Sequence, residues 1–424
     1  MIRFICAVTG LVAVLLGAQA HAQTPARKFC FTPPDDRICP VFPEDQPDFS
    51  RFFEYRVIND VAQHPFDEYA WQAFVALNWQ DVDGDAGEPG WRGHARRTDV
   101  FDRPTGPCAR ADVHPGTVIA GFEQSDGNVL IDQRGNLVVY ETRMNPVAAR
   151  YLTSNRLTTA EGRAAFNGPI SFPRGINAAQ PAAALIKTAW QILPEDDPTM
   201  IEADGLIPIS AEDSADGTAR CLAVRLGLIG MHIATKVQSG HGDKWIWATF
   251  EHRTNVPTAA NARGINSLYA PDLFPDGCQG PKSADDRSYR LFAPDCPDCA
   301  INDPPSTTIM WDAKMPFARR ETGSPAPPSQ IVRCWRIFEP TAATNRVWQE
   351  QLSDTPLANY MLISAQWRGA NPDPIFRDGE LPRYLSNTAL ETYVQTDLNG
   401  TCLGCHALAR TSEGEPSDFT YMLR

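Results

Sequence analysis

The fold is decided by residues 221–237, which read CLAVRLGLIGMHIATKV. Apolar side chains occupy every even position from Leu222 to Leu228, and this period of two is typical of a β-strand with one buried face. We therefore predict a long strand. A straight continuation would place His232 on the same face as those leucines, although the two glycines of the stretch can bend it.

Similar patterns predict more strands along the chain, at residues 183–193, 245–252, 331–338 and 359–367. A hairpin is expected where residues 129–131 and 137–140 flank the turn sequence Asp132-Gln-Arg-Gly-Asn136. Helices are predicted at 66–78 and 388–398. The sum is an α+β fold with a mainly antiparallel sheet, long loops and a few helices. We expect a β-rich domain over residues 23–380, with a C-terminal helix and attachment segment, 381–424, embedded in it.

The first 22 residues have the composition of a secretory signal peptide. A basic start, Met1-Ile-Arg3, precedes an apolar run from Phe4 to Leu16 and the small-residue pattern Ala20-His-Ala22. The run is shorter than the ~18 residues that span a bilayer, which disfavours a membrane anchor. We expect export to the periplasm, and no later transmembrane anchor in the mature chain.

The charge balance limits the choice of partners. A formal net charge of −13 argues against a surface that binds nucleic acid phosphates. An acidic surface can steer a basic redox partner, or it can simply keep the protein soluble. Residues 81–88 carry Asp81, Asp83, Asp85 and Glu88, which resembles a calcium loop but lacks the full twelve-residue pattern, so we interpret them as a solvated turn.

The cysteines divide into two groups. Cys6 is lost with the signal peptide and two belong to a Cys-x-x-Cys-His motif, which leaves an even set suited to four disulfides in an oxidising compartment: Cys30, Cys39, Cys108, Cys221, Cys278, Cys296, Cys299 and Cys334. Cys30 and Cys39 are close enough in sequence to close a small loop. Cys296-Pro-Asp-Cys299 has no following histidine, so it is not a second haem site. We expect these two cysteines to form structural disulfides, with partners that the sequence does not indicate, rather than a redox or metal site.

The motif Cys402-Leu-Gly-Cys405-His406 carries the clearest chemistry. Two thiols three positions apart can form thioether bonds to the vinyl groups of one haem, and the adjacent His406 imidazole then lies under the iron as its proximal ligand. We therefore predict one covalently bound haem c per chain. The alternatives are a disulfide with an incidental histidine, or a zinc site, which would need further ligands.

The sixth iron ligand decides what such a haem does. A histidine or methionine makes an electron-transfer centre, whereas an open position permits peroxidase or oxidase chemistry, or the sensing of a small ligand. His232 and His252 are candidate distal ligands because each lies near the end of a predicted strand with apolar neighbours. We favour His232 over His252, with Met231 and Met422 as weaker candidates.

Only 18 residues follow His406, so the large preceding domain must supply most of a haem pocket. The large size of this domain favours an enzyme, because one-electron transfer does not require so many residues around a haem. No pair of distal catalytic side chains can be recognised from spacing, however, so electron transfer is the function that we predict, with a haem enzyme and a haem sensor as alternatives.

Several segments together resemble a known family: Trp71–Trp79, Gly230-Met-His232 with Trp245–His252, and Cys402–His406 followed by Ser417-Asp-Phe419. They are similar to a bacterial family of secreted cytochrome c proteins with a single C-terminal haem motif. The resemblance implies haem attachment at Cys402 and Cys405 and ligation by His406, and it implies nothing about a substrate.

Overall fold

The computed structural model describes residues 42–43, 59–79, 89–101, 106–109, 113–124, 126–176, 179–237, 244–264, 274–281, 288–296, 299–366, 384–397 and 400–424. The predicted signal peptide, the expected Cys30–Cys39 pair and the acidic loop 81–88 lie outside these residues.

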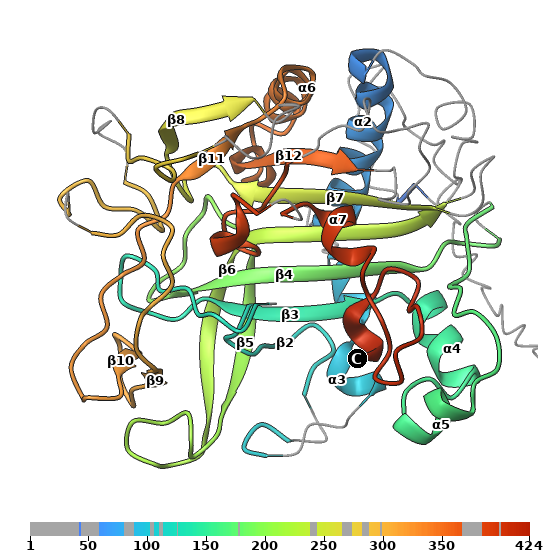
Figure 1. Ribbon diagram of the computed structural model, residues 1–424, viewed down its shortest axis with the longest axis horizontal. Coiled ribbons are helices and arrows are strands. Elements are labelled where there is room, and N and C mark those ends of the chain that lie inside the picture. The colour runs from blue at the N-terminus through green and yellow to red at the C-terminus, as the bar shows by residue number, and fades with distance from the viewer. Residues whose placement is uncertain are drawn as a thin grey trace, which may run out of the picture.

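An eight-stranded sheet forms the centre of the described residues (Figure 1). Its strands are β1 (Ala95–Arg96), β2 (Val118–Ile119), β3 (Val139–Met144), β4 (Ala184–Leu193), β5 (Glu202–Ile209), β6 (Arg220–Val237), β7 (Lys244–His252) and β12 (Tyr360–Gln366). They lie in the order β1-β3-β4-β6-β5-β2, while β7 pairs with the second half of β6 and β12 pairs with β7. Every pairing described in this sheet is antiparallel except that of β2 with β5. The mainly antiparallel α+β prediction is therefore confirmed.

Two small sheets flank the large one. They pair β9 (Ile309–Trp311) with β10 (Ala318–Arg320), and β8 (Thr258–Gly264) with β11 (Arg333–Arg336). The α-helices are α2 (Asn59–Asn78), α3 (Arg97–Val100), α4 (Pro146–Ser154), α5 (Ala160–Ala165), α6 (Glu339–Gln351) and α7 (Cys402–His406). Short 3₁₀ turns lie at Gly90–Gly93, Pro356–Asn359, Thr392–Val394 and Tyr421–Leu423. Among the described helices, none has the length and apolar character that crossing a membrane requires.

The largest apolar core lies between one face of the sheet and helices α2 and α6. Trp71 of α2 stacks on Trp348 of α6 with ring centroids 5.8 Å apart, and Phe74 stacks on Phe250 of β7 at 4.2 Å. All four side chains are buried, and burying each contributes roughly 1.5–3 kcal/mol. We call this side of the sheet the core face.

Strand β6 contains one residue more than its partner. Trp190 of β4 pairs with Leu228, but the preceding Ala189 pairs with Gly230, so Ile229 is an extra residue in the ladder. Such a bulge inverts the alternation of side chains beyond it.

The inversion changes the prediction for His232. Before the bulge, Leu226 and Leu228 point into the large core, whereas beyond it Met231 and Ile233 do so. His232 therefore points to the opposite face, which we call the site face. The prediction that His232 shares a face with the upstream leucines is wrong, because it assumed a straight strand.

Most of the other predicted elements are confirmed. The strands expected at 183–193, 221–237, 245–252, 331–338 and 359–367 correspond to β4, β6, β7, β11 and β12, and the helix at 66–78 is the second part of α2. In the predicted hairpin, Ile131 bridges to Leu137, and Gly135 adopts a positive φ of 76°.

The helix predicted at 388–398 is wrong. Among the described residues of this range, 388–397, only Thr392–Val394 forms a helical turn, and it is of the 3₁₀ type. The side chain of Asn387 accepts the backbone N–H groups of Ala389 and Leu390, and Thr388 donates to Glu251 of β7. Such side-chain hydrogen bonds compete with the backbone hydrogen bonds of a helix. In this segment the side-chain bonds form and the helix does not.

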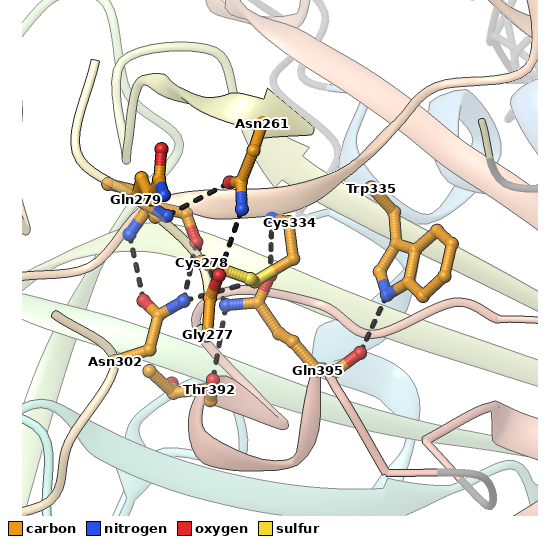
Figure 2. Close-up of a disulfide and its surroundings, with 10 residues drawn as sticks. Asn261, Gly277, Cys278, Gln279, Asn302, Cys334, Trp335, Thr392 and Gln395 are labelled. Carbon is orange, nitrogen blue, oxygen red and sulfur yellow. Dashed lines mark hydrogen bonds between the residues drawn. A yellow bond between two sulfur atoms is a disulfide. The ribbon is translucent and has the colours of Figure 1, made fainter. Parts of the chain in front are cut away.

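Three disulfides join described cysteines: Cys108–Cys221, Cys278–Cys334 and Cys296–Cys299. Disulfide bonding of these cysteines agrees with the expectation, and Cys296 and Cys299, whose partners the sequence did not indicate, bond to each other. Figure 2 shows that the Cys278–Cys334 bridge lies beside Gln395. The Gln395 side chain accepts the N–H of Cys334 at 3.0 Å, and its carbonyl accepts the indole N–H of Trp335 at 2.6 Å. These bonds fasten the C-terminal segment to β11.

A buried carboxyl group in helix α2, that of Asp67, is expected to make the stability of the protein depend on pH. Burial raises the pKa of Asp67 from 3.8 to about 7, in spite of hydrogen bonds from Thr341 and Gln63 that lower it. Because the folded-state pKa lies above the unfolded value, this group favours the folded state below about pH 4, and that contribution is lost as the pH rises to about 7. We expect the free energy of unfolding to fall over this range by up to about 1.4 kcal/mol per pH unit for this carboxyl.

Urea unfolding of the wild type and of Asp67→Asn between pH 4 and pH 8 measures this dependence. The slope should be smaller in Asp67→Asn and unchanged in Asp354→Asn, whose side chain is exposed. Equal slopes in all three proteins would show that Asp67 does not cause it.

Candidate functional site

Helix α7 holds the Cys-x-x-Cys-His motif on the site face of the sheet (Figure 1). Thr401 caps the helix, because its hydroxyl accepts the N–H of Gly404 at 2.9 Å. Leu403 is buried, and its N–H donates to the side chain of Gln366 in β12 at 3.0 Å. The cap and this anchor fix a helix that is too short to be stable alone. Both Cys402 and Cys405 are free thiols.

His406, the last residue of α7, has one engaged ring nitrogen. Its Nδ1 lies 2.7 Å from the carbonyl oxygen of Phe419. A carbonyl can only accept, so Nδ1 carries the proton and Nε2 keeps its lone pair. The ring packs on Trp247 of β7 with centroids 4.1 Å apart. Burial lowers the pKa of His406 to about 4, so the imidazole is neutral at pH 7.

A cavity of about 230 Å³ lies beside this motif. The strands β4, β6 and β7 contribute one wall, and α7 with the C-terminal turn contributes the other. The apolar part of the lining includes Leu185, Ala234, Trp247 and Met422. The polar part includes Cys402, Cys405, His406, His232, Glu391 and Lys187. The structure thus brings His232 to the same cavity as the predicted attachment motif.

His232 is the second imidazole in the cavity. It is 5% exposed, and its Nε2 lies 2.6 Å from a carboxylate oxygen of Glu391. Burial raises the pKa of Glu391, but the interaction with His232, including its hydrogen bond, outweighs this, so the net pKa is lowered and the group is a carboxylate at neutral pH. Nε2 of His232 therefore donates to Glu391. Its Nδ1 is buried and has no hydrogen-bond partner among the described residues.

His252 is not among the residues that line the cavity. Its Nε2 donates to the carbonyl of Thr199 at 3.1 Å, and its Nδ1 lies 2.9 Å from the hydroxyl of Thr254. Burial lowers the pKa of this ring to about 3. Both nitrogens are engaged, so His252 is a core histidine satisfied by its own neighbours.

Of the two methionine candidates, one lines the cavity and the other does not. Met231 lies on the core face, where the amide of Asn78 approaches its sulfur at 3.4 Å. Met422 is buried and lines the cavity.

Sequence reasoning missed three residues that shape the cavity: Glu391, Trp247 and Lys187. Glu391 was missed because residues 388–398 were expected to form a helix, which gave no reason to place its side chain in the cavity. Trp247 and Lys187 belong to strands that were predicted, but the face on which their side chains lie depends on the register of β4, β6 and β7. In this register Lys187 pairs with His232, and Trp247 pairs with Ala234.

Within the described residues, no group of three or more His, Cys, Asp or Glu side chains is arranged to hold a metal ion by itself. No family model, curated protein or solved structure matches this chain.

The two thiols of α7 should differ in reactivity. Cys405 is exposed, whereas Cys402 is half-buried. Burial raises the pKa of both thiols, and it raises that of Cys402 well above its usual range. We expect iodoacetamide to alkylate Cys405 severalfold faster than Cys402 in the haem-free chain, because the thiolate is the reactive form. Both cysteines lie in the tryptic peptide of residues 384–410, so fragment ions from tandem mass spectrometry of this peptide measure the two rates separately. A Cys402–Cys405 disulfide in that chain would contradict the assignment of two free thiols.

Proposed function

We propose that this chain is a periplasmic c-type cytochrome that transfers electrons through one haem c. Cys402 and Cys405 would bind the haem covalently, and His406 and His232 would be its axial ligands. One observation carries the proposal: two free thiols and two imidazoles line one cavity, and each imidazole has one ring nitrogen engaged by an acceptor and the other without a described partner.

The environment of both histidines fits metal ligation. Ligating histidines usually donate their second N–H to a backbone carbonyl or a carboxylate, which fixes the tautomer and makes the other nitrogen a better ligand. Phe419 supplies the carbonyl for His406, and Glu391 supplies the carboxylate for His232. The unpartnered Nδ1 of His232 would otherwise be a buried polar atom with an uncompensated desolvation cost.

Two strong axial ligands favour electron transfer over chemistry at an open iron position. Bound haem supplies an iron that changes between the ferric and ferrous states. Cys405 is exposed, so this part of the cavity lies near the surface, where a redox partner protein can approach. The net charge of −13 favours a basic partner.

The periplasmic location rests on two observations. The N-terminal sequence has the pattern of a signal peptide, and the disulfides of the described residues suit an oxidising compartment. Membership of the secreted cytochrome c family with a single C-terminal haem motif is part of the same proposal.

Covalent haem attachment is the first test. After expression in a host that matures c-type cytochromes, we expect the wild-type band on a denaturing gel to stain for haem, with one haem per chain in a pyridine spectrum. The double variant Cys402→Ala/Cys405→Ala should lose the stain completely. The matched control is Cys296→Ala/Cys299→Ala, which removes a Cys-x-x-Cys without a histidine and should keep it. A wild-type chain without iron or colour would overturn the proposal.

The sixth ligand is the second test. Carbon monoxide should bind slowly or not at all to the ferrous wild type, because His232 must first leave the iron, and at least tenfold faster to His232→Ala. His252→Ala should behave as the wild type in this assay. Immediate binding of carbon monoxide by the wild type would instead favour the five-coordinate enzyme or the ligand sensor.

A further inference from the structure

The turn that faces His406 has an unfavourable backbone conformation. Asp418 and Phe419 have φ angles of 52° and 65°, although neither is glycine. The N–H of Thr420 donates to the carbonyl of Ser417 at 3.2 Å and closes the turn. A left-handed conformation is unfavourable for an L-residue other than glycine, because its Cβ comes too close to the following carbonyl oxygen. Such strain persists only where the surrounding contacts offset it, and it is concentrated at functional sites.

The side chain of Asp418 makes the offsetting contacts. Its carboxylate accepts the N–H of Phe172 at 2.7 Å, the ammonium of Lys236 at 2.5 Å and the indole N–H of Trp245 at 3.3 Å. Lys236 is 2% exposed and also donates to the hydroxyl of Ser171 at 3.0 Å. Lys236 belongs to β6 and Trp245 to β7, so the anchor is the sheet itself.

The turn directs one carbonyl group. Phe419 follows Asp418 directly, and its carbonyl oxygen is the acceptor 2.7 Å from Nδ1 of His406. With right-handed φ angles at these two residues, the peptide planes would rotate and this oxygen would point elsewhere. The strained turn and the proton position of His406 are therefore linked through a single peptide group.

We propose that Asp418 and Lys236 are positioning residues for His406. They hold the Phe419 carbonyl on Nδ1, fix the ring orientation and the tautomer, and thereby strengthen Nε2 as an electron donor. The effect on iron rests on the proposed haem function, whereas the effect on the tautomer does not. A stronger donor stabilises the ferric state, so loss of this bond raises the reduction potential.

The main variant is Asp418→Asn/Lys236→Met, which removes both charges together and leaves no unpaired buried charge. In the haem-bound protein we expect the ferric–ferrous equilibrium to shift about tenfold toward ferrous iron, which corresponds to about 59 mV for one electron. Trp245→Phe removes only the longest of the three hydrogen bonds to Asp418. It should shift the potential in the same direction by less, and it serves if the double variant does not fold.

The matched control is Glu141→Gln/Arg143→Met, because this pair is also buried in the sheet and no described contact joins it to residues 401–424. It should lower the stability and leave the potential unchanged. A main variant that loses stability as the control does, with an unaltered potential, would show that Asp418 and Lys236 are only structural.

The tautomer is measured without haem, in the full-length Cys402→Ser/Cys405→Ser chain. Nitrogen-15 spectra of His406 should show a proton on Nδ1 in this background, and a mixture of tautomers when the Asp418 and Lys236 substitutions are added. A wild-type chain without haem would defeat the proposed function and still permit this measurement. An Nδ1 proton that persists in the absence of Asp418 and Lys236 would defeat the positioning role.

Discussion

The extra residue in β6 is the constraint on which the candidate site depends. Strand β6 pairs with β4 from Arg225 to Thr235, with β5 over its first half and with β7 over its second. The bulge at Ile229 lets this one strand send Leu228 to the core face and His232 and Lys236 to the site face. Without it, the imidazole and the ammonium would be directed into the apolar core, where burying them unpaired is costly. The same strand thus contributes to the core on one face and places His232 and Lys236 on the opposite face.

Local periodicity explains which parts of the fold were predictable. The period of two identifies β4, β6 and β7 because their side chains alternate within a few residues. It cannot reveal a bulge, which depends on how the neighbouring strand pairs, and the facing of His232 was therefore inferred incorrectly. The segment 388–398 has a composition suited to a helix, but Thr388 and Asn387 bond to β7, at residues 137 or 138 positions away. Contacts between residues so far apart in the sequence cannot be recognised from a local pattern.

The candidate site also has one part that the sequence predicts and one part that it does not. The motif Cys402–His406 is visible in the sequence because the proposed covalent attachment of haem would require a fixed spacing of neighbouring residues. Glu391 is 159 positions from His232, and Asp418 is 182 positions from Lys236. Only the fold brings these pairs together. The sequence could therefore indicate which residues would bind a cofactor, but not which residues orient them.

The C-terminal segment explains how a five-residue helix can hold the His406 imidazole in a fixed position. It is fastened to the sheet and its flanking strand at successive points: Thr388 to Glu251, Gln395 to Cys334, Leu403 to Gln366, and Asp418 to Lys236 (Figure 2 shows the second). Glu251 is itself buried and paired with Arg333, so that anchor is costly to break. Both walls of the cavity are consequently joined to the same sheet. Side chains held in this way by a second layer of hydrogen bonds keep their geometry, which would suit the proposed redox centre, because it would gain and lose electrons without rearranging.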